Sequence, residues 1–131
     1  MYVANIMSSA LVAAVPWLPA SRLVELMVDE NIGAVPVIDD DGSPLGIVTR
    51  SDVLEEDELN LDGEVTAAEL MRRSPLTVYP TTPIAEAARL MARQRVHHLL
   101  VVDGSGRLVG MVSSFDVVRW VADVEAVRPQ G

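Results

Sequence analysis

One motif occurs twice in this chain, and the second copy lies 64 residues after the first. The copies are residues 46–53 (GIVTRSDV) and residues 110–117 (GMVSSFDV). Each has a glycine, two apolar residues, a hydroxyl, two variable positions, then Asp and Val. The same offset aligns Pro16 with Pro80 and Gly42 with Gly106. Matches at turn residues arise by chance less readily than matches among Val and Leu, so the pattern indicates a tandem duplication.

Each repeat is predicted to fold in the order strand–helix–strand–strand–helix, which gives an α/β (α+β) protein. The predicted elements, taken pairwise from the two repeats, are an extended segment ending at Pro16 or Pro80, a helix over Ala20–Asn31 or Ile84–Gln94, a strand over Ile32–Ile38 or Val96–Val102, a strand over Pro44–Val48 or Leu108–Val112, and a closing helix from Ser51 or Phe115. The first of these strands is almost continuously apolar in both repeats, which predicts burial on both faces.

The repeats are predicted to span residues 1–58 and 67–124. Between them we expect an acidic linker at 59–66, since six of the ten residues 55–64 are Asp or Glu. Residues 125–131 are expected to form a flexible tail. The acidic stretch is interpreted as a solvated helix end and linker, and no metal site is predicted.

Composition excludes several classes of function. The chain has 131 residues, of which 50% are hydrophobic and only 4% aromatic, so its core must be aliphatic. It has no Cys, which removes disulfides and thiolate chemistry and fits a reducing, cytoplasmic location. The net charge of −9 repels nucleic acid and anionic lipid, so neither is expected as a partner. The longest apolar run, residues 10–20, has about half the length that spans a bilayer and contains two prolines.

The repeated motif has a structural interpretation. Thr49-x-x-Asp52 and Ser113-x-x-Asp116 each match a capping box, in which the hydroxyl and the carboxylate bind free amides at the start of a helix. On this interpretation the two residues stabilise the closing helices and have no other role. Duplication alone does not favour a functional role, because structural caps are duplicated too.

The ordered set of strands, turns and hydroxyl-x-x-Asp motifs, present twice over residues 3–122, resembles the CBS domain. The tandem resembles the CBS pair known as a Bateman module. This resemblance implies two repeats packed sheet to sheet about a pseudo-twofold axis, with two clefts between them. It also implies that the clefts bind adenosine ligands such as AMP, ADP, ATP or S-adenosylmethionine. A carboxylate would accept the ribose hydroxyls, aliphatic side chains would enclose adenine, and a hydroxyl at a helix N-terminus would favour phosphate.

The resemblance assigns residues to two sites. Site one would comprise Ile47, Thr49, Arg50, Asp52, Arg73, Thr77, Val78, Val96, His97, His98 and Leu99. Its phosphate contacts would be Arg73 and His97, with His98 as a second cation when protonated. Site two would comprise Ala13, Ala14, Ile32, Gly33, Val35, Pro36, Met111, Ser113 and Asp116. Site one is predicted to be the stronger nucleotide site, because Gly33 stands in site two where His97 stands in site one.

The function predicted on this basis is a regulatory sensor of an adenine nucleotide, with no required cofactor and no catalytic residues. We expect a homodimer associated through the apolar closing helices, and a separate protein partner that receives the signal. Two alternatives remain open. One is a ligand-free interaction scaffold with vestigial clefts, and the other is a small enzyme acting on a nucleotide phosphate.

Overall fold

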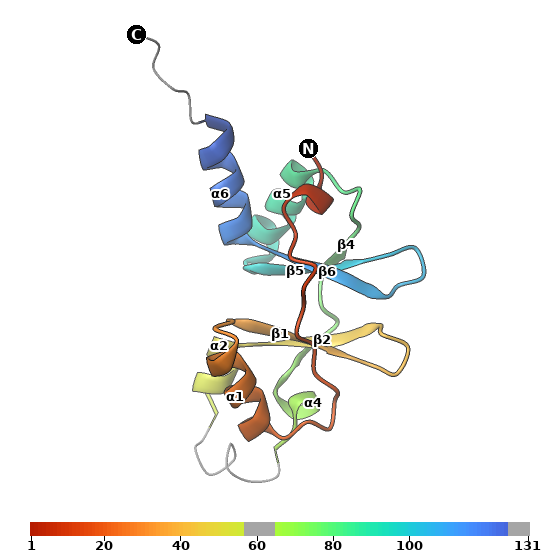
Figure 1. Ribbon diagram of the computed structural model, residues 1–131, viewed down its shortest axis with the longest axis vertical. Coiled ribbons are helices and arrows are strands. Elements are labelled where there is room, and N and C mark those ends of the chain that lie inside the picture. Colours follow the sequence, from red (N-terminus) through yellow and green to blue (C-terminus); the bar gives the residue numbers. More distant parts are fainter. Residues whose placement is uncertain (57–64, 126–131) are drawn as a thin grey trace.

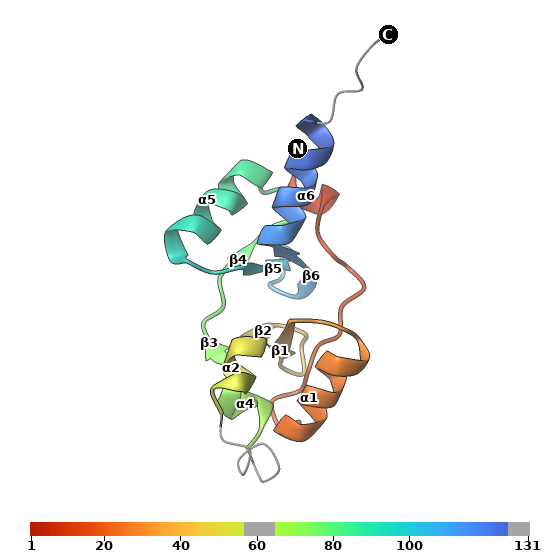
Figure 2. The ribbon, with the colours of Figure 1, turned by 90° about the vertical axis from the view of Figure 1, so that its left-hand side faces the viewer.

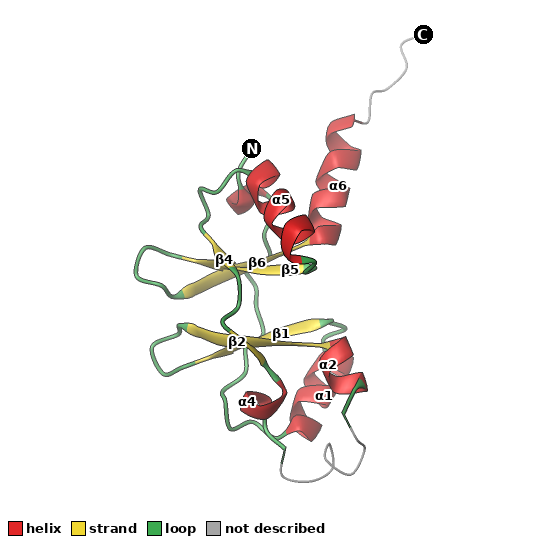
Figure 3. Ribbon diagram, turned by 180° about the vertical axis from the view of Figure 1, so that it is seen from behind, coloured by secondary structure: helices red, strands yellow, loops and turns green. Residues whose placement is uncertain are grey.

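The computed structural model describes residues 1–56 and 65–125, which form two three-stranded sheets between outer layers of helices (Figure 1). The first sheet has the order β1 (Ala34–Ile38), β2 (Pro44–Thr49) and β3 (Arg72–Arg73), and the second β4 (Thr77–Val78), β5 (His98–Val102) and β6 (Leu108–Ser113). The helices are η1 (Val3–Asn5), α1 (Ala20–Asp29), α2 (Arg50–Leu54), α4 (Ala67–Leu70), α5 (Ile84–Gln94) and α6 (Ser114–Glu125). Seen from behind, the two sheets face each other and the helices lie outside them (Figure 3).

The predicted α+β class and element order are confirmed, with two corrections. The strands β1 and β5 begin two residues later than predicted, because each preceding helix ends in a turn. Asn31 and Arg95 adopt left-handed backbone conformations there, with φ of 52° and 55°. The first strand of the first repeat is reduced to one parallel bridge between Ala14 and Val37. Most of the predicted linker and tail lies outside the described residues.

Each sheet has its own core on its helical side. Alternate residues of β1 and β5 point toward the helices, so Val35 and Val37 belong to one core and Leu99 and Val101 to the other. The intervening residues point the opposite way. Leu100, in the middle of β5, is only 1% exposed yet lies outside both helical-side cores, so it faces the other sheet. The prediction that these strands are buried on both faces is confirmed.

The two repeats exchange the short segments that precede them, which the sequence did not predict. Val3, in η1 at the start of the chain, lies in the core of the second repeat, and its N–H donates to the Thr82 carbonyl. Ala67 and Leu70, in α4 just before the second repeat, lie in the core of the first. Figure 2 shows the two segments crossing between the layers on opposite sides of the molecule. As a result, β3 pairs with β2 and brings Arg72 and Arg73 to the first sheet.

Candidate functional site

A cleft of about 640 Å³ opens where β2 passes into α2, between the two sheets. Its size lies within the range of small-molecule sites. Four segments contribute to it, and the lining residues are Gly33, Ile47, Thr49, Arg50, Ser51, Arg72, Arg73, Ser74, Pro75, Leu76, Arg95, Val96, His97, His98 and Leu100. Residues from both repeats therefore meet in one cavity, as the assignment to site one requires.

The structure gathers most of the site-one residues at this cleft. Seven of them line it: Ile47, Thr49, Arg50, Arg73, Val96, His97 and His98. Leu99 and Val78 instead lie in the helical-side core of the second repeat. Thr77 is exposed on β4 and is not among the lining residues. Which of these residues contact a ligand stays a prediction.

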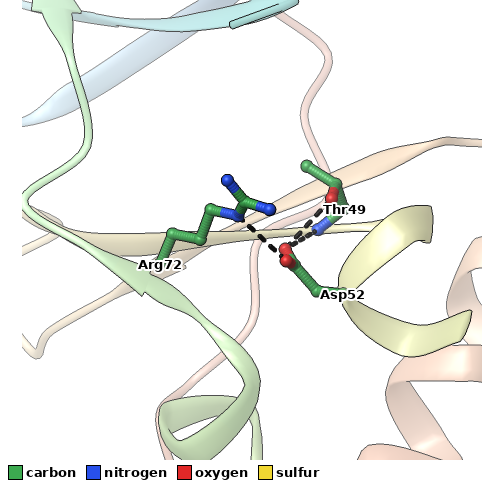
Figure 4. Close-up of polar contacts among 3 residues, drawn as sticks. All are labelled: Thr49, Asp52 and Arg72. Carbon is green, nitrogen blue, oxygen red and sulfur yellow. Dashed lines mark hydrogen bonds and ion pairs between the residues drawn. The ribbon is translucent and has the colours of Figure 1, made fainter. Parts of the chain in front are cut away.

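Asp52 accepts three hydrogen bonds beside the cleft (Figure 4). It is not itself among the lining residues, whereas its partners Thr49 and Arg72 are. Its Oδ2 accepts hydrogen bonds from the Thr49 backbone N–H at 2.8 Å and from the Thr49 hydroxyl at 3.0 Å. Its Oδ1 accepts a hydrogen bond from Arg72 Nε at 3.0 Å, which is also an ion pair. The bond and the attraction to Asp52 raise the pKa of Arg72. The Asp52 side chain is only 9% exposed.

Positive charge is concentrated in the cleft, although the chain as a whole is acidic. Arg50, Arg72, Arg73 and Arg95, four of the ten basic residues, line it, and so do both histidines. All four arginines are exposed, so they can reach a ligand. Burial lowers the pKa of His98, and His97 beside it lowers that pKa further, while Asp116 acts in the opposite direction. His98 is thus uncharged at neutral pH, and the expected second cation is better supplied by an arginine.

The site-two residues are arranged differently. Ser113 and Asp116 form the same type of cap, in which the Ser113 N–H donates to Asp116 Oδ2 at 2.8 Å. Arg119 on the same helix donates to Asp116 Oδ1 at 3.1 Å. Gly33 lines the large cleft already described, together with the site-one residues. The other predicted members range from half-buried to core positions: Ala13, Ile32 and Met111 are half-buried, and Ala14, Val35 and Pro36 are buried.

Sequence reasoning missed Ser51, Arg72, Ser74, Pro75, Leu76, Arg95 and Leu100. One signal was available for the arginines. With the offset of 64 residues, Arg72 and Arg73 fall on Ser8 and Ser9, and Arg95 falls on Asn31. Arginine therefore stands in the second repeat at three positions where the first repeat has a neutral residue, and all three arginines line this cleft.

The described part of the chain lacks two other features, a metal site and a membrane-spanning helix. Within residues 1–56 and 65–125, no group of three or more His, Asp or Glu side chains is placed to hold a metal ion. The helices described there are too short or too polar to cross a membrane.

The fold and the cleft define a class of protein: a pair of duplicated α+β repeats that share a cleft between their sheets. A family model for the CBS domain matches residues 3–58 and again 67–123, so the chain belongs to the CBS domain family, with two domains in tandem.

Relatives include stand-alone and multidomain proteins. A CBS domain-containing protein of Dictyostelium discoideum is 34% identical over 112 residues, covering 76% of this chain and 77% of the relative. Inosine-5'-monophosphate dehydrogenase of Mycobacterium tuberculosis is 37% identical over 90 residues, which cover 68% of this chain but only 16% of the enzyme. The similarity to the dehydrogenase is thus confined to a small part of it.

Solved structures of CBS pairs share the fold. CBSX2 of Arabidopsis thaliana in complex with AMP superposes with a TM-score of 0.86 at 29% identity, covering 95% of this chain and 98% of CBSX2. The cytosolic domain of the Mg²⁺ channel MgtE in complex with ATP gives 0.78 at 27% identity, covering 91% of this chain and 48% of the MgtE chain. The CBS pair of protein MJ0100, in complex with 5'-methylthioadenosine and S-adenosylmethionine, gives 0.85 at 25% identity, covering 95% and 98%.

Proposed function

We propose that this chain is a regulatory module that binds an adenine nucleotide in the cleft lined by Thr49, Arg50 and His97. The observation that supports this most strongly is the concentration of four arginines around a cavity of about 640 Å³ in an acidic chain. CBS pairs of the same fold bind AMP, ATP or S-adenosylmethionine, which supports an adenosine ligand. No catalytic residue is assigned, and the similarity to an enzyme is confined to a small part of that enzyme.

In this proposal the ribose hydroxyls bind the Asp52 carboxylate at the start of α2. Adenine lies against Ile47 and Val96, whose aliphatic side chains line the cleft. The phosphates face Arg50 and Arg73, whose guanidinium groups donate paired hydrogen bonds to phosphate oxygens. Binding at this cleft would bridge the two repeats, because Asp52 belongs to the first and Val96 to the second.

We infer that the signal is passed through association of two copies. Two apolar grooves, one per repeat, lie between paired helices on the outer side of the sheets. The first helix groove, of about 400 Å³, is lined by Val24, Met27, Val28, Asn31, Arg50, Val53 and Leu54. The second helix groove, of about 460 Å³, is lined by Ala88, Met91, Ala92, Arg95, Val96, His97, Ser114, Val117 and Val118.

These grooves suit a second copy of the chain. Each lining residue of the first groove falls on a lining residue of the second with the offset of 64 residues, so the two grooves occupy equivalent places in the two repeats. Leu54 and Val118 at equivalent positions are 83% and 64% exposed. Apolar side chains exposed at repeated positions favour a symmetric, self-complementary interface. A homodimer would then present the nucleotide-dependent surface to a separate regulated protein.

One observation favours the alternative of a ligand-free scaffold. Thr49 and Asp52 form the capping box, and Arg72 occupies the remaining carboxylate oxygen, so every feature of the motif has a structural use. The sensor and the scaffold are distinguished by the effect of removing the Asp52 carboxylate on ligand affinity.

Titration calorimetry with AMP, ADP, ATP and S-adenosylmethionine tests the proposal on the wild type, Asp52→Ala and Asp116→Ala. Both variants remove the same type of cap, so both should lose roughly 1 kcal/mol of stability. Only Asp52→Ala should lose affinity, by roughly tenfold or more, because a hydrogen bond to a charged group contributes about 1.5–3 kcal/mol.

The other outcomes distinguish the alternatives. A loss confined to Asp116→Ala would place the nucleotide in site two. Absence of heat with all four ligands would favour the scaffold. Chromatography of the nucleotide after incubation tests the enzyme alternative, which requires hydrolysed product.

A further inference from the structure

Asp52, the carboxylate that the proposed function assigns to ribose, already accepts hydrogen bonds from protein groups. The Thr49 N–H and hydroxyl both donate to Asp52 Oδ2, and Arg72 Nε donates to Oδ1 at 3.0 Å. A carboxylate oxygen accepts about two hydrogen bonds, so Oδ2 is saturated and Oδ1 has one position left. A ribose diol that binds Asp52 through both hydroxyls needs both positions of Oδ1. One of the three donors must therefore leave, and because the Thr49 contacts form the capping box of α2, we expect it to be Arg72.

The Arg72 side chain can change its position without a change in the fold. Its backbone is fixed in β3 opposite Ile47, while its side chain is 66% exposed. It also lines the cleft, so a guanidinium released from Asp52 stays within reach of a bound ligand. The Arg72 end of this ion pair is exposed, although the Asp52 end is only 9% exposed. Solvent screening at the arginine keeps the pair weak, at about fivefold in an equilibrium constant, and a ligand can overcome it.

We propose that Arg72 exchanges partners when a nucleotide binds: it releases Asp52 to the ribose and turns its guanidinium to the phosphates beside Arg50 and Arg73. The cleft would then select phosphorylated adenine nucleotides over uncharged adenosine and over cationic S-adenosylmethionine. This inference rests on the proposed function and identifies the class of ligand within it.

The surrounding charges explain the selectivity. Once Asp52 is hydrogen-bonded to ribose, Arg72 loses its direct contact with that carboxylate and lies in a cleft that Arg50, Arg73 and Arg95 also line, with Glu55 as a further carboxylate that acts on it. An uncharged ligand leaves the repulsion among these arginines uncompensated, and a sulfonium adds to it. A phosphate chain adds negative charge among the arginines and accepts charge-assisted hydrogen bonds from their guanidinium groups.

The arrangement is specific to one repeat. Ser8 stands at the position equivalent to Arg72 and cannot form an ion pair. Asp116, equivalent to Asp52, is bound instead by Arg119 from its own helix, and Arg119 is not among the residues that line the cleft. Partner exchange is therefore not a general property of the duplicated fold.

Titration calorimetry with adenosine, AMP and ATP tests the exchange on the wild type and on Arg72→Gln, Arg73→Gln and Arg89→Gln. Arg89, exposed on α5 and outside the cleft lining, controls for net charge. Arg72→Gln should bind adenosine up to about fivefold more tightly, because no ion pair has to be broken. The same variant should bind ATP roughly tenfold more weakly, because a charged phosphate contact is lost. Arg73→Gln should weaken only the phosphorylated ligands, and Arg89→Gln should change nothing.

The results separate this inference from the proposed function. If the wild type binds none of the three ligands, the proposed function fails and the exchange with it. If the wild type binds nucleotides but Arg72→Gln leaves adenosine affinity unchanged or lowers it, the exchange is overturned while the sensor stands. Equal affinity of the wild type for adenosine and ATP would also overturn the selectivity.

Discussion

At the scale of the residue, the two copies of the motif differ in the size of the side chains that contact them. Gly33 lies beside the Arg50 side chain, and a Cβ at position 33 would be in ordinary van der Waals contact with Arg50 Nε at 3.6 Å. In the second repeat the sizes are reversed, and His97 Nδ1 lies 3.3 Å from the hydroxyl of Ser114. Each repeat therefore contributes one large basic side chain where the other has a small residue. Both side chains, Arg50 and His97, line the same cleft.

His98 makes the stability of the fold depend on pH. Burial lowers the pKa of His98 below its ordinary value of 6.5. As the pH falls through 6.5 the unfolded chain takes up a proton that the folded chain resists, so the free energy of unfolding decreases on acidification. We expect urea denaturation to show lower stability at pH 5.5 than at pH about 7.5. His98→Ala, which installs the residue found at position 34 of the first repeat, should reduce this difference.

The range of pH isolates the histidine from the carboxylates. The Ser105 hydroxyl and the backbone N–H groups of Arg107 and Ser105 lower the pKa of Asp103 below 3.8, so that group stays ionised throughout the measurement. If His98→Ala showed the same loss of stability as the wild type between the two pH values, another group would be responsible.

The hydrogen-bond partners of a residue could be predicted from the sequence only where those partners lie a few residues away along the chain. The cap between Thr49 and Asp52 spans three residues, and the motif alone predicts it. The ion pair between Asp52 and Arg72 spans 20 residues. It exists only because a segment crosses from one repeat to the other, and no local pattern contains that information.

At the scale of the element, two strand glycines allow the exchanged segments to pack. A Cβ on Gly46 would lie 2.6 Å from Met71 Sδ and 2.7 Å from the Arg72 carbonyl oxygen. At the equivalent Gly110 it would lie 2.7 Å from Met7 Sδ and 3.1 Å from the Ser8 carbonyl oxygen. Each glycine in the middle of a strand thus accommodates the close approach of a segment from the other half.

We expect Gly46→Ala to destabilise the protein by roughly 1–3 kcal/mol, because β3 must move away from β2 to relieve the overlap. The displacement would carry Arg72 and Arg73 with it, so nucleotide affinity should fall as well. Thermal denaturation and calorimetry measure the two effects. Gly110→Ala should cost less, since its backbone contact is longer, and Gly104→Ala is the control because its Cβ would meet nothing within 4 Å. A Gly46→Ala variant as stable as Gly104→Ala would show that the segment packs elsewhere in solution.

The elements themselves were largely predictable, because periodicity and turn residues mark them. The predictions were wrong where the formation of a strand depends on which other strand lies beside it. Arg72–Arg73 carries no strand pattern, yet it forms β3 because β2 offers an open edge beside it. The segment before Pro16 was predicted as a strand, yet it forms a single bridge at Ala14.

At the scale of the whole molecule, the cleft and the two helix grooves are joined by shared residues. Arg50 lines both the cleft and the first helix groove, and Arg95 lines both the cleft and the second. A phosphate that draws these side chains into the cleft would change the outer surface of each repeat. Ligand binding and self-association would then be coupled, and by linkage each would strengthen or weaken the other to the same extent.

Substitution of one groove residue by arginine should abolish the association of two copies while nucleotide binding in the cleft is retained. Leu54→Arg and Val118→Arg place a charge at equivalent positions in the two grooves, and a buried unpaired charge opposes association. We expect the wild type to sediment as a dimer and both variants as monomers. The nucleotide affinity of the variants should differ from that of the wild type only by the free energy that couples ligand binding to self-association. Tyr79→Arg is the control, because Tyr79 is 56% exposed and lines neither groove. This variant should remain a dimer. A wild type that is monomeric at every concentration and nucleotide level, or a dimer that survives both substitutions, would exclude the helix grooves as the interface.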